Sequence, residues 1–543
     1  MTGDQTTGPA DGHEHTARWE SFETVGPEAP AGGGNGRRRT VLSGVVVVVL
    51  ALLGGGAYAA YSFLDGGGSQ PADVLPASTV AVVSIDLDPS ASQKIAALKS
   101  IRKFPALKKS LGLQADDDLR KFAIDKIVEH GDCQGLDFAD DVEPWLGKRA
   151  AIAAVDLGGP DPSPVIALQI DDRAKAQQGF RALVDCTHPQ DFGFAVGEDY
   201  LVASDSVAHA QAVLDRGAQK PLADDAAYQR WTGEVGDAGV LGFYVAPHAA
   251  DYAARLFDDL GNNVFDSSGG GFTFADPGSS AGGEDTAAKD LLAGFAGLAG
   301  TVRFSDGGME LAVAYGGLDQ LRDAPVVGDE VGQLPGDTAI ALGFGASPTG
   351  TGRTVEQFAG TDLASAEDET GLQLPDDLAT LLGKAVTLSL GGPAPRSFDD
   401  IEGPDDLSAG LVIHGDAAKI KAIIATLEDH LGFQLSDVPI AVQDSGDKVA
   451  LSTGGYGSTL LKDGDLGSKD GFRTAIPEAD KASSVLYVDF NSPWRDLFVE
   501  AVSGESPRAG SGVGENTEPL RSLGISAWQD GAVTHGLLKV TTD

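Results

Sequence analysis

One apolar stretch occurs twice in this 543-residue chain. PWLGKRAAIAAVDLGG covers residues 144–159, and TLLGKAVTLSLGG covers residues 380–392. Both contain Leu-Gly-Lys, continue into a strand-like apolar run and end in Gly-Gly. A chain that repeats such a stretch is expected to repeat the supersecondary unit around it.

Further matches follow in the same order along both parts of the chain. Five segments of the first part each match one segment of the second part. The pairs are VLPASTVAVVSIDL with QLPGDTAIALGFG, PVIALQIDDRAKAQQGFRALVD with GLVIHGDAAKIKAIIATLED, DYLVASDSVAHAQAVLDRG with DKVALSTGGYGSTLLKDG, VLGFYVAP with VLYVDFNSP, and TVRFSDGGMELAV with ISAWQDGAVTHGLL. Each match is weak alone, but their collinear order is specific. We therefore predict two tandem repeats, residues 74–322 and 333–543, joined by a linker over residues 323–332.

The pattern inside each copy mixes two periods. VAVVSIDL, AAIAAVDL and VIALQI are short apolar runs with β-branched residues and predict strands. Ile420, Ile423, Ile424 and Leu427 recur at helical spacing. FAVGEDYLVAS and VRFSDGGMELAVA have hairpin turn chemistry. The fold class is therefore predicted to be α+β, a mainly antiparallel sheet with helices on one face. A Rossmann-like parallel sheet is disfavoured because the last strands turn back too quickly for crossovers.

The Leu-Gly-Lys motif has a structural interpretation. Leu146 and Leu382 are predicted to end helices, and Gly147 and Gly383 to take the left-handed conformation that follows a helix end. Trp145 aligns with a leucine in the second copy, so its position requires apolar volume. We expect the indole to pack in the core and not to stack on a ligand.

The N-terminal part predicts one membrane segment. Residues 1–36 are polar, without apolar periodicity, and are predicted to be a disordered cytoplasmic tail. Arg37, Arg38 and Arg39 precede an uncharged, Val-rich run, residues 40–64, which is long enough to cross a bilayer as a helix. The positive-inside rule places these arginines in the cytoplasm and the bulk of the chain outside.

A cleaved export signal is the alternative for the same segment. Arg38-Arg39 fits a twin-arginine motif, and Ala57-Tyr58-Ala59 fits a cleavage site. The long Val-rich run favours an anchor. In both cases residues 65–73 form an extracytoplasmic linker, and the localisation is the cell envelope.

Charge and cysteine content exclude several partners. The chain has 39 Lys and Arg against 80 Asp and Glu, a net charge of −41. Such a surface repels phosphate backbones and anionic lipid headgroups, so no nucleic-acid partner is expected. Its two cysteines, Cys133 and Cys186, form no C-x-x-C motif, which excludes thiolate metal sites. Outside the cytoplasm they are predicted to form one disulfide, with two separate buried thiols as the alternative.

Several motifs together resemble a known family. They are the basic-flanked N-terminal helix, Leu-Pro-x-x-Thr at the start of an apolar strand, and Glu-Pro-Trp-Leu-Gly before another strand. This arrangement resembles a domain-of-unknown-function family (number 3352) of membrane-anchored, uncharacterised actinobacterial proteins. The resemblance implies an envelope location and a large extracytoplasmic region, and it implies no activity.

Short motifs that are typical of catalytic and metal-binding sites occur in this chain, but without the surrounding elements or partner motifs that such sites require. G-x-S-x-G over residues 278–282 lies in a Gly/Ser-rich loop and not between a strand and a helix. Ser100 to Lys103 matches S-x-x-K, but the chain has no Lys-Thr-Gly. Asp463-Gly464-Asp465 resembles a calcium loop whose ligand order fails. We therefore predict no catalytic, cofactor-binding or metal-binding residues and no enzyme activity.

Three function classes stay open. The first is an acidic envelope module that binds an unknown envelope protein or another ligand. The second is a carrier of a small apolar ligand in a cavity between sheet and helices, and the third is an envelope hydrolase. A cavity lined only by Val, Ile, Leu and Phe would favour the carrier.

Overall fold

The computed structural model describes a little under two-thirds of the chain. These are residues 68–86, 137–187, 192–252, 294–305, 307–317, 323–346, 370–397, 400–432, 434–435, 439–505 and 517–543, with Gln93, Ala96, Ser100, Lys103, Glu367 and Asp368. The tail 1–36, the basic residues Arg37, Arg38 and Arg39, and the predicted membrane segment 40–64 lie outside them. In the described part, no helix has the length and apolar character that a membrane span requires.

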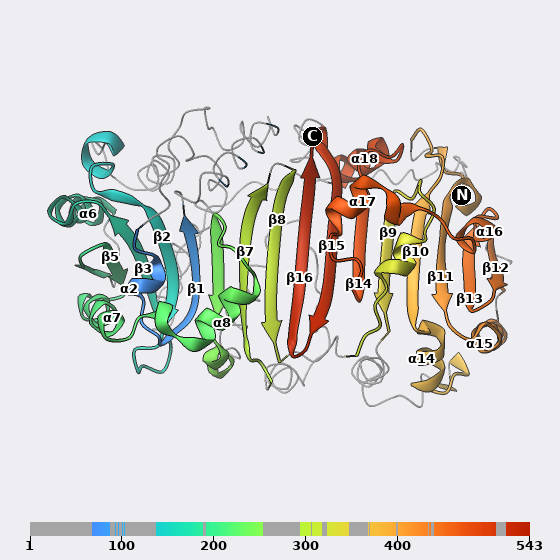
Figure 1. The fold of residues 1–543 in the computed structure, drawn as a ribbon, viewed down its shortest axis with the longest axis horizontal. Helices are drawn as coiled ribbons and strands as arrows, with labels where there is room; N and C mark the ends of the chain where they lie inside the picture. The colour runs from blue at the N-terminus through green and yellow to red at the C-terminus, as the bar shows by residue number, and fades with distance from the viewer. Residues whose placement is uncertain are drawn as a thin grey trace, which may run out of the picture.

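All described strands belong to one sixteen-stranded sheet, in which every neighbouring pair is antiparallel (Figure 1). The first eight strands are β1 (Thr79–Asp86), β2 (Leu146–Val155), β3 (Ser163–Ile170), β4 (Gly193–Val196), β5 (Tyr200–Ser204), β6 (Leu241–Val245), β7 (Gly297–Ser305) and β8 (Gly308–Gly316). The other eight are β9 (Ile340–Gly345), β10 (Ala385–Gly391), β11 (Ser408–His414), β12 (Ile440–Ser445), β13 (Lys448–Thr453), β14 (Ser484–Asp489), β15 (Leu520–Asp530) and β16 (Val533–Thr542). The predicted antiparallel α+β class is confirmed.

The two halves of the sheet have the same strand order. From one edge to the middle the order is β4-β5-β3-β2-β1-β6-β7-β8, and from the other edge it is β12-β13-β11-β10-β9-β14-β15-β16. The halves meet where β8 pairs with β16, with Leu311 opposite Leu538. Strands that are distant in sequence therefore continue one hydrogen-bonded sheet across the middle of the molecule.

The helices are short and flank the sheet. They are α2 (Pro71–Val74), α6 (Arg173–Thr187), α7 (Val207–Gln219), α8 (Ala226–Glu234), α11 (Gly328–Gly332), α14 (Asp376–Leu382), α15 (Ala417–Leu431), α16 (Gly457–Leu460), α17 (Asp470–Ala475) and α18 (Arg495–Glu505). Single turns of other helix types are η1 (Phe138–Val142), η2 (Leu222–Asp224), η3 (Pro247–Ala249), η6 (Pro404–Asp406) and η7 (Leu466–Ser468).

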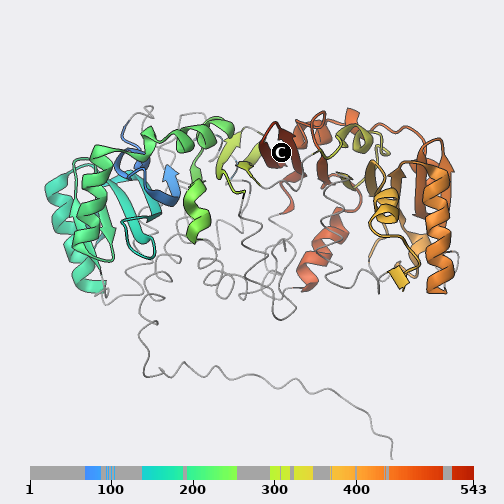
Figure 2. The same ribbon diagram turned by 90° about the horizontal axis from the view of Figure 1, so that it is seen from below.

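The sheet is an arch with two unlike faces (Figure 2). We call the convex face, over which α8 and α17 lie, the outer face, and the concave face the inner face. On the outer face, Val202 and Tyr244 pack in one core with Trp231 of α8. Val485 and Tyr487 pack in a second core with α11 and α17. Each half of the sheet thus buries its outer face under its own helices.

The expectation that helices cover one face is wrong at the sheet's edges. Strand β5 is buried along its whole length, with Val202 facing the outer core and Leu201 facing the core beside α6. At the opposite edge, Ile413 of β11 packs with Ile420 of α15. Consecutive apolar residues in these strands require cover on both faces, because alternate side chains point to opposite sides.

The Leu-Gly-Lys interpretation is confirmed in one copy only. There Leu382 ends α14 as predicted, and Gly383 follows with a positive φ of +58°, although its ψ of −146° lies outside the left-handed helical region. Gly147 instead lies inside β2, where Leu146 begins the strand. A Cβ on Gly147 would lie 2.8 Å from Cγ of Gln169, so close approach requires the glycine there.

The expected core position of Trp145 is confirmed. Its indole is buried, meets the ring of Phe180 edge-to-face and donates a 2.7 Å hydrogen bond to the carbonyl of Asp141. The predicted Cys133–Cys186 disulfide lies outside the described residues, since Cys133 and the side chain of Cys186 are not described. It stays a prediction.

Candidate functional site: an apolar pocket on the inner face

A continuous row of apolar side chains crosses the inner face on all sixteen strands. In spatial order the row is Val196, Leu201, Leu168, Ala150, Ile85, Leu241, Val302, Leu311, Leu538, Ile525, Leu486, Leu342, Leu388, Leu411, Leu451 and Val442, each directly opposite the next. Side chains at one register position stand on the same face. One row of the inner face is therefore apolar from edge to edge.

Part of this inner face is accessible to solvent. Leu342, Phe344 and Leu388 are 37%, 36% and 39% exposed. Their outer-face neighbours on the same strands, Ala341 and Thr387, are fully buried. Large apolar residues on an accessible face are informative because solvent exposure of such a group is unfavourable.

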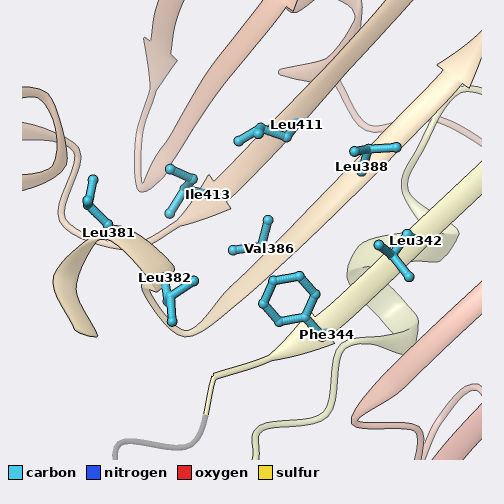
Figure 3. Close-up of a pocket in the computed structure, with 8 residues that line it drawn as sticks. All are labelled: Leu342, Phe344, Leu381, Leu382, Val386, Leu388, Leu411 and Ile413. Carbon is cyan, nitrogen blue, oxygen red and sulfur yellow. The ribbon is translucent and has the colours of Figure 1, made fainter. Parts of the chain in front are cut away.

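These exposed residues line a pocket of about 310 Å³ (Figure 3). It is lined by Leu342 and Phe344 of β9, Val386 and Leu388 of β10, Leu411 and Ile413 of β11, and Leu381 and Leu382 of α14. The strand residues form two cross-strand rows, Phe344–Val386–Ile413 and Leu342–Leu388–Leu411. The last turn of α14 lies beside Val386 and Ile413 and closes one end (Figure 3).

The chemistry of the pocket is restricted by its lining. All eight side chains are hydrocarbon, so none donates or accepts a hydrogen bond or exchanges a proton. The volume lies at the lower end of the ~300–1,000 Å³ range of small-molecule sites. The pocket can therefore exclude water from an apolar group, and it offers no side chain for metal binding or catalysis.

The equivalent place in the first half of the sheet is less exposed. The same register gives the rows Ile85–Ala150–Leu168 and Val83–Ile152–Ile166, with Trp145 and Leu146 in place of the two leucines of α14. There Ile85, Trp145 and Leu146 are all buried. The two halves share a strand order but differ in the accessibility of this place.

One cluster resembles a catalytic triad and lacks its geometry. Asp205 Oδ1 lies 2.5 Å from Nδ1 of His209, and Ser163 Oγ lies 3.2 Å from the same nitrogen. A triad requires the serine and the acid on opposite ring nitrogens. Ser206 next to them accepts a hydrogen bond from the His209 amide and caps α7. The cluster is a helix start.

Two aspartates of the calcium-like loop lie beside lysines. Asp463 lies 3.3 Å from Lys448, and Asp465 lies 3.2 Å from Lys469. Among the described residues no group of three or more His, Cys, Asp or Glu is arranged to hold a metal. Lys103, from the S-x-x-K match, donates to Thr542 Oγ1 at 2.9 Å, and residues 278–282 lie outside the described part.

Sequence reasoning did not name the pocket residues. The signal was present in IALGFG and AVTLSLG, where large residues alternate with Ala, Gly, Ser or Thr. The small residues face the outer core, and the large ones face inward. Such alternation shows which residues share a face, but not whether a helix covers that face.

Fold and pocket together define an α+β protein with one long antiparallel sheet and an apolar pocket on its concave face. Residues 42–263 match the model of the family described as "Protein of unknown function (DUF3352)", which confirms the family resemblance over that part of the chain. The matched part ends before the pocket residues. No curated protein and no solved structure shows a significant match.

Proposed function

We propose that this protein binds and carries a small apolar ligand in the pocket between β9, β10, β11 and α14. The observation that carries the proposal is the exposure of Leu342, Phe344 and Leu388 in a pocket lined only by Leu, Phe, Val and Ile. A ligand that covers these side chains removes apolar surface from water, at about 25 cal/mol per Å². The broader expectation of an envelope binding module includes this function.

Ligand retention tests the proposal. The full-length protein, extracted from its own membrane in polymer-bounded lipid discs, is analysed by native mass spectrometry. We expect a retained apolar small molecule in the wild type and at least about tenfold less of it in Leu388→Trp, because the indole fills the pocket. Val207→Trp is the control, since Val207 is 62% exposed on α7. Equal retention in Leu388→Trp and the wild type, or no retained molecule, would contradict the proposal.

We also propose that the chain is a single-pass membrane protein of the cell envelope. Arg37, Arg38 and Arg39, followed by the uncharged residues 40–64, support a cytoplasmic N-terminus. Residues 65–543 then lie outside, where an apolar ligand from the membrane or its surroundings can reach the pocket.

Protease accessibility checks this orientation. Protease added to intact spheroplasts is expected to digest the part beyond residue 65 and to spare a cytoplasmic marker protein. Survival of that part until the membrane is lysed would show that the orientation is wrong.

We further propose that residues 74–322 and 333–543 are two copies of one ancestral unit, as the internal matches indicate. The identical strand order of the two halves supports this proposal. The exposed pocket is then a specialisation of the second copy, because its counterpart beside Trp145 is less exposed.

A further inference from the structure

One cation stands next to the apolar pocket. Lys384 follows Gly383 at the end of α14 and is exposed. Its amide donates to the His414 carbonyl at 2.8 Å, and its carbonyl accepts from the Ala346 amide at 3.2 Å. Its backbone therefore continues the ladder of β10 on both sides.

The strand alternation gives the direction of this side chain. Residues two apart on a strand stand on the same face, about 7 Å apart. Lys384 is two residues before Val386, which lines the pocket. The side chain of Lys384 thus leaves the backbone on the inner face, at the end of the pocket where α14 meets the sheet.

Lys384 differs from most described lysines in having no acidic partner. Seven of them lie 3.9 Å or less from a carboxylate: Lys175, Lys419, Lys421, Lys448, Lys469, Lys481 and Lys539. Within the described part, no ion pair involves Lys384. A lysine without an ion pair beside an apolar pocket is a candidate partner for an anionic group of a ligand.

We propose that the ligand is a fatty acid, whose acyl chain fills the pocket and whose carboxylate pairs with Lys384. This inference rests on the proposed function and names its ligand class. The pocket's hydrocarbon lining is complementary to the acyl chain of a fatty acid, and the ammonium group of Lys384 is complementary to its carboxylate. The overall negative charge disfavours binding to an anionic membrane surface, whereas one carboxylate requires only one local cation. The small volume suits a medium chain.

Photo-crosslinking separates the two parts of this inference. The full-length protein in lipid discs is labelled with a dodecanoate analogue that carries a diazirine at the chain end. Labelled peptides are then identified by mass spectrometry. We expect the label on the peptide that contains Leu381 to Leu388. Unlabelled dodecanoate should compete with this labelling about threefold to fivefold more strongly than dodecanol, since a partly exposed ion pair usually contributes a free energy of that size.

Variants of the lysine test the head-group contact. Lys384→Gln should remove the preference for dodecanoate and leave competition by dodecanol unchanged, whereas Lys384→Arg should keep it. The matched control is Lys148→Gln, at the equivalent position of the first copy, which should change neither competitor.

Two outcomes overturn the inference in different ways. If dodecanol competes as well as dodecanoate in the wild type, or Lys384→Gln leaves the preference intact, the anionic head is wrong and the apolar pocket stands. If Leu388→Trp does not reduce labelling, pocket binding itself fails, and the proposed function fails with it.

Discussion

Replacing Trp231 with alanine is expected to lower the free energy of unfolding by about 3–5 kcal/mol. The indole is fully buried in the first core. It lies over two cross-strand glycines, Gly297 and Gly316, whose hypothetical Cβ atoms would lie 2.1 Å and 2.5 Å from its atoms. Its N–H donates a 2.7 Å hydrogen bond to the Ala296 carbonyl. Rigid backbone on this side cannot collapse into the space left behind, so a cavity remains.

Urea titration of the full-length protein, followed by circular dichroism, measures this effect. Trp231→Phe keeps most of the volume but leaves the Ala296 carbonyl without its donor, and should cost about 1–2 kcal/mol. Val207→Ala is the control at an exposed site and should stay within about 0.5 kcal/mol of wild type. A Trp231→Ala transition that coincides with wild type would show that this half does not depend on the indole.

Removing the guanidinium of Arg149 is expected to cost about 3 kcal/mol. Arg149 is 3% exposed, and its Nε donates to Asp86 Oδ2 at 2.9 Å across β1 and β2. Loss of one partner of a buried ion pair typically costs about 3–5 kcal/mol, because the other charge stays desolvated. Asp86 is 21% exposed, so solvent screens part of the loss and the lower end applies.

A double-mutant cycle distinguishes the ion pair from simple packing. Arg149→Met and Asp86→Asn are made singly and together, and the free energy of unfolding of each variant is measured in urea. We expect the double variant to be more stable than the sum of the single losses predicts, since no charge is then left buried. One nitrogen of Arg149, Nη2, is buried without a hydrogen-bond partner, and the double variant removes this unsatisfied group as well. Strict additivity would contradict coupling between the two residues.

The strands were predictable because their signal is local. The predicted strands correspond to β1 (VAVVSIDL), β2 (AAIAAVDL) and β3 (VIALQI). The residues predicted at helical spacing, Ile420, Ile423 and Ile424, form the buried side of α15. Alternation and helical spacing act through side-chain direction, which depends on a few neighbouring residues. The positive φ of Gly383 at the end of α14 was predictable for the same reason.

Features that depend on distant partners were not predictable in this way. Gly147 and Gly383 stand in the same motif, yet only Gly383 has a positive φ, because Gly147 lies inside β2 beside Gln169 of β3. Likewise, β5 is covered on both faces because α6 packs on one face and α7 packs on the other. The sequence pattern alone did not place these helices.

The amino-acid sequence by itself determined the α+β class and the faces on which Leu342, Phe344, Val386 and Leu388 stand. Only the tertiary structure decided that β8 joins β16, so that two halves form one arched sheet. It also decided that the concave side is more exposed at β9 and β10 than beside Trp145. The physical reason is that side-chain direction is set by local backbone geometry, whereas exposure depends on which distant segments pack on that face.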